Sequence, residues 1–226
     1  MNRLFKKGAL LAFAFASLVV VNANAQLIIT GMVDGTNTGG NPKSMEIFST
    51  SAIADLSNFY IIRDTNGAGP WDTFVQLPTV ALAANSFFYV AGNTDSASAL
   101  NGFGFTVGLT NSVLSINGDD IIGLATPNVT FTTGSNISEF DVIDAFGQES
   151  QGDTNFYEDS IAYRDGTSLT PVPAGVLDAG NFNISGYSDL SLQSTFGTYA
   201  IPEPSTFALI SVGLAGLLFH RRRRQG

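Results

Sequence analysis

Cysteine is absent from the 226 residues of this sequence, and histidine occurs once, at His220. Without cysteine the chain has no disulfide, no thiolate nucleophile and no cysteine-ligated zinc. His220 lies in a C-terminal segment that we expect to be removed, so we expect the mature protein to have no histidine for a catalytic triad or a metal. These absences exclude most common hydrolase mechanisms and leave a hydrophobic core as the main source of stability.

Positive charge is also scarce in the central part of the chain. Between residues 26 and 200 only Lys43, Arg63 and Arg164 are basic, against eighteen acidic residues, which gives a net charge of −15. A basic nucleic-acid footprint is therefore missing, and we expect no nucleic-acid partner. The charge agrees with a soluble exported domain and with affinity for divalent cations. The length of this region fits a single domain with one core.

The start of the chain has the features of a secretory signal. Three basic residues precede an apolar stretch over residues 8–21. Ala23 and Ala25 then form an A-x-A cleavage site, so the mature chain is expected to begin at Gln26. An uncleaved anchor is disfavoured because the apolar stretch is short and the cleavage site is good. The sequence thus predicts a signal peptide over residues 1–25, with the Sec translocon and a signal peptidase as partners.

The end of the chain carries a second apolar segment. Pro202, Glu203 and Pro204 predict a stiff, exposed hinge before an apolar run over residues 207–219. A helix of 13 residues is about 20 Å long, shorter than the ~30 Å hydrocarbon core of a membrane. Four arginines follow the run: Arg221, Arg222, Arg223 and Arg224. A permanent tail anchor is therefore disfavoured, although the helix is expected to hold the chain in a membrane transiently.

In this order and spacing, the Pro-Glu-Pro, the short apolar helix and the arginine cluster resemble the PEP-CTERM sorting signal of Gram-negative bacteria. The resemblance covers residues 201–226. It implies that a membrane-embedded exosortase recognises the tail and removes it near the Pro-Glu-Pro. It also implies transient insertion in the inner membrane, followed by a location at the cell surface or in the extracellular matrix of a biofilm-forming bacterium that makes an exopolysaccharide.

The region between the two signals shows the pattern of short β-strands separated by turns. Runs rich in Ile, Val, Phe, Tyr and Thr predict strands over residues 27–33, 44–48, 59–63, 73–76, 86–91, 113–116, 120–124, 129–132, 140–146 and 161–163. Asn117-Gly118 predicts a hairpin turn, and only residues 97–100 are expected to form a short helical turn. Phe182 and Phe196 are expected to return the looser C-terminal part to the core. The pattern indicates an all-β sandwich.

Several segments occur in the order seen in bacterial lamin-tail domains, which the region therefore resembles. They are LIITGMVDG (27–35), KSMEIF (43–48), LSNFYII (56–62), NSFFYVAG (85–92), NGDDIIGL (117–124), EFDVIDAFG (139–147) and YEDSIAYRDG (157–166). The resemblance implies an immunoglobulin-like β-sandwich within residues 26–200. The tryptophan-bearing closing strand of that family has no clear counterpart, so the end of the domain stays open between residues 165 and 200.

Carboxylates are the main candidates for chemistry. Glu46 is expected to lie inward and to accept backbone N–H bonds or pair with Lys43 or Arg164, and contact with a ligand or ion is the alternative. Asp119 and Asp120 are neighbours on a predicted strand and would point to opposite faces, so they cannot readily chelate one ion together. The lamin-tail resemblance implies that the second of them anchors a loop.

No pair of carboxylates is placed for acid–base catalysis. Asp141 and Asp144 are three residues apart on a predicted strand and are expected to face opposite ways. Glycoside hydrolysis needs two carboxylates held across a cleft, and the sequence singles out no such pair. Trp71 and the aromatic residues of the strands are expected to be core residues, with an exposed sugar-stacking platform as the alternative.

One acidic segment is a candidate for Ca²⁺, which takes 6–8 oxygen ligands. The candidate ligands are Glu149, Asp153, Glu158 and Asp159. The acidic pattern of an EF-hand loop is missing, so a solvated acidic face is the alternative, and no other cofactor is expected.

The sequence as a whole predicts an exported, non-enzymatic protein with a structural or adhesive role in the cell envelope or extracellular matrix. Expected partners are the exosortase and extracellular polysaccharide or envelope components. A Ca²⁺- or carbohydrate-binding module is one alternative. A hydrolase acting on matrix polymers is another, and the lack of a mature histidine and of a nucleophile motif counts against it.

Overall fold

A computed structural model describes residues 27–67, 71–128, 140–147, 157–164 and 182–200. The strands are β1 (Leu27–Asn37), β2 (Asn41–Ser49), β3 (Tyr60–Asp64), β4 (Thr73–Gln76), β5 (Ser86–Ala91), β6 (Val107–Thr110), β7 (Ile121–Pro127), β8 (Phe140–Phe146), β9 (Ser160–Arg164) and β10 (Phe182–Gly186). The α-helices are α1 (Thr94–Gly102) and α2 (Asp189–Thr195), and short 3₁₀ turns are η1 (Leu56–Asn58), η2 (Thr65–Gly67) and η3 (Ser112–Leu114).

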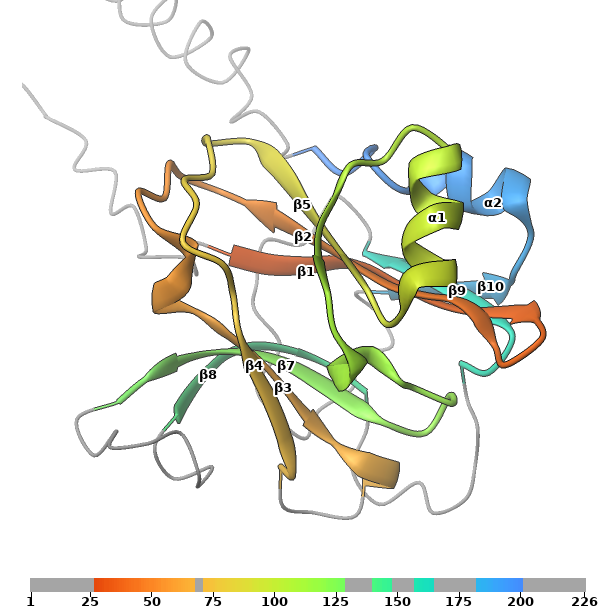
Figure 1. Cartoon of the computed structure of the whole chain (residues 1–226), viewed down its shortest axis with the longest axis horizontal. Coiled ribbons are helices and arrows are strands. Elements are labelled where there is room, and N and C mark those ends of the chain that lie inside the picture. Colours follow the sequence, from red (N-terminus) through yellow and green to blue (C-terminus); the bar gives the residue numbers. More distant parts are fainter. Residues whose placement is uncertain (1–26, 68–70, 129–139, 148–156, 165–181, 201–226) are drawn as a thin grey trace, which may run out of the picture.

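The strands form two sheets that face each other (Figure 1). The larger sheet has the order β10-β9-β1-β2-β5-β6, and all its pairs are antiparallel except β5–β6. The smaller sheet has the order β4-β3-β7-β8 and is antiparallel throughout. The predicted all-β sandwich is thereby confirmed.

The main core lies between the two sheets because alternate strand residues point inward. In β1, Leu27 and Ile29 belong to this core, and so does Met32 after them. The change from odd to even positions follows from a register shift between Ile29 and Gly31, where one extra residue enters β1. The bulge thus turns Gly31 to the outer face of the larger sheet, where the ring of Phe196 packs against it.

The two helices cover the outer face of the larger sheet (Figure 1). Asn93 caps α1 by accepting a hydrogen bond from the Ser96 N–H at 2.8 Å. Ser188 caps α2 through a capping box with Ser191. The sequence predicted only a short turn over residues 97–100 and missed α2. Both helices are short and mostly polar, so the sequence shows little helical periodicity of apolar residues. Their N-cap residues are the clearer signals of where they begin.

The segment before β7 corrects one expectation. Residues 113–116 were expected to be a strand paired with 120–124 through a turn at Asn117-Gly118, and this is wrong. The 3₁₀ turn η3 occupies Ser112–Leu114, and β7 pairs with β3 and β8 instead. Val113, Leu114 and Ile116 are buried in the main core, so their apolar run has the composition of a strand without its conformation.

The remaining expectations from the sequence differ in their outcome. Strands β6 and β10 were missed, while the expected strand over residues 129–132 lies outside the described residues. Phe182 and Phe196 are both buried, as expected, but in different layers. Phe182 lies on β10 in the main core, and Phe196 follows α2 on the outer face of the larger sheet.

Candidate functional site

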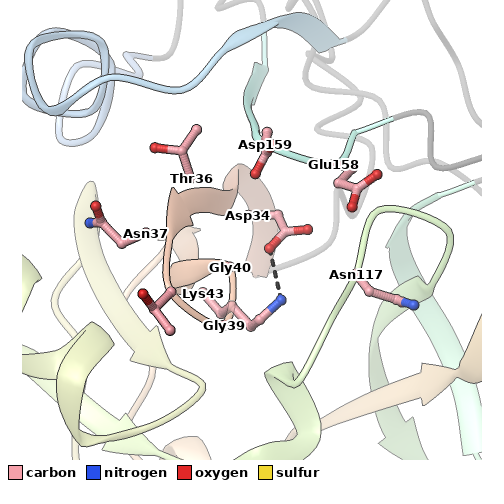
Figure 2. A pocket seen from close by; sticks show the side chains of 10 residues that line it. Asp34, Thr36, Asn37, Gly39, Gly40, Lys43, Asn117, Glu158 and Asp159 are labelled. Atoms are coloured by element: carbon pink, nitrogen blue, oxygen red, sulfur yellow. Dashed lines mark hydrogen bonds and ion pairs between the residues drawn. The ribbon is translucent and has the colours of Figure 1, made fainter.

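A polar cleft of about 490 Å³ opens where β1 turns into β2 (Figure 2). Three separate stretches contribute to it: the β1–β2 turn with its flanking strand ends, the loop before β7 and the two residues just before β9. Its lining residues are Asp34, Thr36, Asn37, Thr38, Gly39, Gly40, Lys43, Asn117, Glu158 and Asp159. The lining holds three carboxylates and one ammonium group, so the cleft has a net negative charge.

An ion pair between Asp34 and Lys43 lies at the centre of the cleft (Figure 2). The two residues are opposite each other in the β1–β2 register, and Lys43 Nζ lies 2.8 Å from Asp34 Oδ1. The ammonium also donates to the carbonyl of Ile116. Burial raises the pKa of Asp34 to about 6, an effect that Lys43 opposes and the charges of Asp159 and Glu158 reinforce. The cleft therefore contains a carboxyl group with a pKa of about 6.

Glycines in the tight β1–β2 turn leave room for the ion pair. Gly39 and Gly40 both have positive φ, at +77° and +70°, a conformation that side chains disfavour. A Cβ at Gly40 would lie 2.6 Å from Lys43 Nζ and 2.7 Å from Asp34 Oδ1. Glycine at this position therefore allows the ion pair to form beneath the turn.

Helix α1 is tied to this turn by side-chain hydrogen bonds. Asn41 Oδ1 accepts from Asn93 Nδ2 at 2.8 Å and from Ser96 Oγ at 3.0 Å. Ser96 Oγ in turn accepts from the Lys43 N–H at 2.8 Å. The cap of α1 thus fixes the start of β2 and the base of the Lys43 side chain.

The loop before β7 packs closely against the start of β9. Gly118 has a φ of +96°, and a Cβ there would lie 2.6 Å from the Glu158 amide nitrogen. Asp120 holds the loop by accepting from the backbone N–H groups of Asn66 and Asn117, each at 3.1 Å. Burial raises the pKa of Asp120, and these two donors oppose the rise. The expected loop-anchoring role of Asp120 is confirmed.

A second ion pair is completely buried and joins three strands. Arg164 Nη2 on β9 lies 2.8 and 2.7 Å from the two carboxylate oxygens of Asp144 on β8. Arg164 Nε donates to the Ile29 carbonyl of β1 at 2.8 Å, and the Ile29 N–H donates to Asp144 at 2.6 Å. Asp141 is exposed, but the expectation that Asp141 and Asp144 face opposite ways is wrong. A bulge lies between them, and their partners on β7, Thr126 and Leu124, are two positions apart, so the two aspartates lie on the same face of the sheet.

Glu46 lies on the outer face of the larger sheet, with 1% of its surface exposed. Its carboxylate accepts from Thr30 Oγ1 at 2.7 Å and from the Gly197 N–H, and the Tyr89 hydroxyl also bonds to it. The expected backbone N–H donor is confirmed. The expected alternative of a charged partner is wrong, because Lys43 pairs with Asp34 and Arg164 pairs with Asp144. Burial raises the pKa of Glu46 to about 7.

The structure describes only two of the four predicted Ca²⁺ ligands. Glu158 and Asp159 are exposed and line the polar cleft near Asp34 (Figure 2). Glu149 and Asp153 lie outside the described residues. Within the described ranges, no three His, Cys, Asp or Glu side chains are grouped to hold a metal ion. The four-residue Ca²⁺ site therefore stays a prediction.

Trp71 lies outside the main core. It is half-buried and packs against Tyr60, Ile62 and Phe140 on the outer face of the smaller sheet. Phe74 extends the same face and is 41% exposed, with its ring centroid 5.6 Å from that of Phe140. The expectation that the aromatic residues fill the core therefore holds for many strand positions and fails for Trp71.

Some of these residues could not be selected from the sequence. Asp34 was not singled out, although the Gly39-Gly40 turn with Lys43 beyond it was a usable signal for a facing pair. The contact between Glu46 and Gly197 joins residues 151 positions apart, and no local pattern predicts it. The signals over residues 1–25 and 201–226 lie outside the described residues, and none of the described helices is long and apolar enough to cross a membrane.

Comparison with known proteins finds a match for the C-terminal tail. Residues 200–224 match the family model of the PEP-CTERM protein-sorting motif, a range that contains the Pro-Glu-Pro and all four arginines. No curated protein and no solved structure matches the chain. The lamin-tail resemblance of the body therefore stays a prediction. The matched motif marks an exported protein that an exosortase sorts, and it implies membrane anchoring of the tail before processing.

Proposed function

We propose that this protein is a non-enzymatic component of the cell envelope or the extracellular polysaccharide matrix, with a structural or adhesive role. The observation that carries the proposal is the sorting motif over residues 200–224, which directs an exported chain to an exosortase. The folded body supplies a rigid two-sheet scaffold for such a role. Its final location is the cell surface or the matrix, where polysaccharide or other envelope components are its partners.

The chemistry of the body supports a role without catalysis. Residues 26–200 contain neither histidine nor cysteine, so the usual general bases and thiol nucleophiles are missing. Lys43 and Arg164 are both engaged in ion pairs with aspartates. The net charge of −15 keeps such a domain soluble and well hydrated outside the cell.

A binding module is the second candidate function, and the polar cleft favours it. Asp34, Glu158 and Asp159 contribute carboxylates to one opening, with amide and hydroxyl groups around them. Such groups bind cations or the hydroxyls of a sugar. This function is compatible with an adhesive role, because a matrix protein can hold its polymer through such a cleft.

The intact mass of the exported protein tests the sorting part of the proposal. We expect the protein from its native host to begin at Gln26 and to lack the apolar run over residues 207–219. A host without its exosortase, or a variant with Pro202→Ala and Pro204→Ala, is expected to keep the tail. A wild-type protein that still ends at Gly226 in a host with an exosortase would contradict the proposal.

The absence of catalysis is tested separately on the same exported protein. It is incubated with the polysaccharides of its host, and newly released reducing ends are measured. We expect no release above a heat-denatured control, and steady turnover would establish a hydrolase instead.

A further inference from the structure

Residues 196–200, here called the strap, follow α2 across the outer face of the larger sheet. Phe196 packs so closely on β1 that a Cβ at Gly31 would lie 2.5 Å from its ring. Its ring centroid lies 6.1 Å from that of Tyr89 and 5.9 Å from that of Phe105. The beginning of the strap is therefore held by an aromatic cluster.

The other end of the strap is held by a second aromatic contact. The ring of Tyr199 lies 5.0 Å from that of Phe48, and Ile28 belongs to the same buried cluster. Ile28 is the second residue of β1, so Tyr199 is anchored beside the start of the folded body. The sorting motif begins at the next residue, Ala200, which is exposed.

Between these two contacts, Glu46 holds the strap through the backbone. Gly197 has a φ of +75°, and its N–H donates to the Glu46 carboxylate. The other donors to that carboxylate are Thr30 on β1 and Tyr89 on β5, both under the strap. Glu46 thus holds the strap between its two aromatic contacts, at Gly197, which lies three residues before the matched motif.

We propose that Glu46 is a positioning residue for exosortase processing: it docks the strap on the sheet and fixes the place where the sorting signal leaves the body. This inference rests on the proposed sorting by an exosortase. The docked strap is part of the fold, so processing falls beyond Tyr199 and the mature protein keeps the strap. An undocked strap would instead present an accessible peptide on both sides of Ala200.

The docking is expected to depend on pH. The titratable or polar groups that face Glu46 are Thr30 from β1, Tyr89 from β5 and the Gly197 amide from the strap, and none of them is charged near neutral pH. Burial raises the pKa of Glu46 from 4.5 to about 7. A raised carboxyl pKa favours the docked state most below the ordinary pKa, and this advantage is lost as the pH rises through about 7.

Hydrogen exchange of the exported protein tests the inference. The measured quantity is the protection factor of the strap amides, corrected for the intrinsic pH dependence of exchange. We expect it to fall about tenfold from pH 6 to pH 8 in the wild type, as one titrating group of this pKa requires. In Glu46→Gln, which mimics the neutral carboxyl, we expect the same change to be absent. Asp189→Asn, an exposed acid-to-amide change on α2, is expected to behave like the wild type.

The intact mass of the same samples separates the outcomes. Glu46→Ala removes the acceptor, and we expect products ending at several positions, some of them before Tyr199. A wild-type protein that ends before Phe196, or a Glu46→Gln protein with unchanged pH dependence, would overturn the inference and leave the sorting proposal intact. A wild-type protein that keeps Gly226 would overturn the sorting proposal itself. Glu46→Gln keeps the inference testable if Glu46→Ala does not fold.

Discussion

Two of the three basic residues in the body each pair with one aspartate, and the two pairs differ in environment. The Asp34–Lys43 pair lies at the cleft, where Lys43 is 14% exposed, whereas both side chains of the Asp144–Arg164 pair are fully buried. A buried pair adds little to stability compared with apolar residues of the same size, but removing one partner leaves an uncompensated charge. The Asp144–Arg164 pair also bonds to both backbone polar groups of Ile29.

Replacing Asp144 by asparagine is expected to destabilise the protein by about 3–5 kcal/mol, because Arg164 then stays buried without its counter-charge. Chemical denaturation measures the free energy of unfolding. Asp141→Asn makes the same change at an exposed position of β8, and its effect is expected to stay within about 0.5 kcal/mol. Equal effects of the two variants would show that the buried pair has no such role.

Single residues were predictable where one physical rule decided their environment. A buried carboxylate needs hydrogen-bond donors, and this rule correctly predicted backbone bonds to Glu46. The same rule does not say which group is the donor. The charged partners considered for Glu46, Lys43 and Arg164, were wrong. Asp34 was missed because its environment depends on the loop at Asn117 and on the start of β9, which are distant in sequence.

At the scale of elements, most strands were predictable, whereas β6, β10 and the helices were not. The apolar alternation of β2 and the compact aromatic run of β5 both match their predicted strands closely. Helix α1 buries only Ser96 and Leu100, so its sequence shows no apolar stripe. Tertiary packing also decided η3, where an apolar run fills the core from a 3₁₀ turn.

The capping box of α2 gives a prediction at this scale. Ser188→Ala removes the side chain that accepts from the Ser191 N–H at 3.0 Å, and we expect a loss of about 1 kcal/mol in the free energy of unfolding. Ser194→Ala lies on the exposed side of the same helix and is expected to change stability far less. Thermal unfolding of the two exported variants is the measurement, and a larger effect of Ser194→Ala would contradict the capping assignment.

At the scale of the whole molecule, the net charge of −15 over residues 26–200 sets its response to ions. Raising the NaCl concentration from 10 to 150 mM is expected to raise Tm, because salt screens the repulsion between acidic groups. CaCl₂ at matched ionic strength is expected to raise Tm no further if the acidic groups only respond to screening. A larger rise that EDTA reverses, and that Glu158→Gln with Asp159→Asn abolishes, would favour the binding module.

Strand β1 runs between the end of the body where the tail leaves and the end that carries the polar cleft. The described chain begins at Leu27 and ends at Ala200, and their neighbours Ile28 and Tyr199 belong to one buried cluster, so both lie at the same end of the sandwich. The cleft residue Asp34 lies seven positions further along β1, about 23 Å away at ~3.3 Å per residue. The exit point of the tail and the polar cleft therefore lie at opposite ends of one strand.

This arrangement limits how far the body can move from the bilayer before the tail is removed. Seven residue steps separate Ala200 from Phe207, where the apolar run of the tail begins, and an extended chain covers at most about 25 Å in that number of steps. While the tail is anchored, a connecting segment of this length keeps the strap end of the body close to the lipid. The polar cleft lies at the other end of β1 from this attachment point.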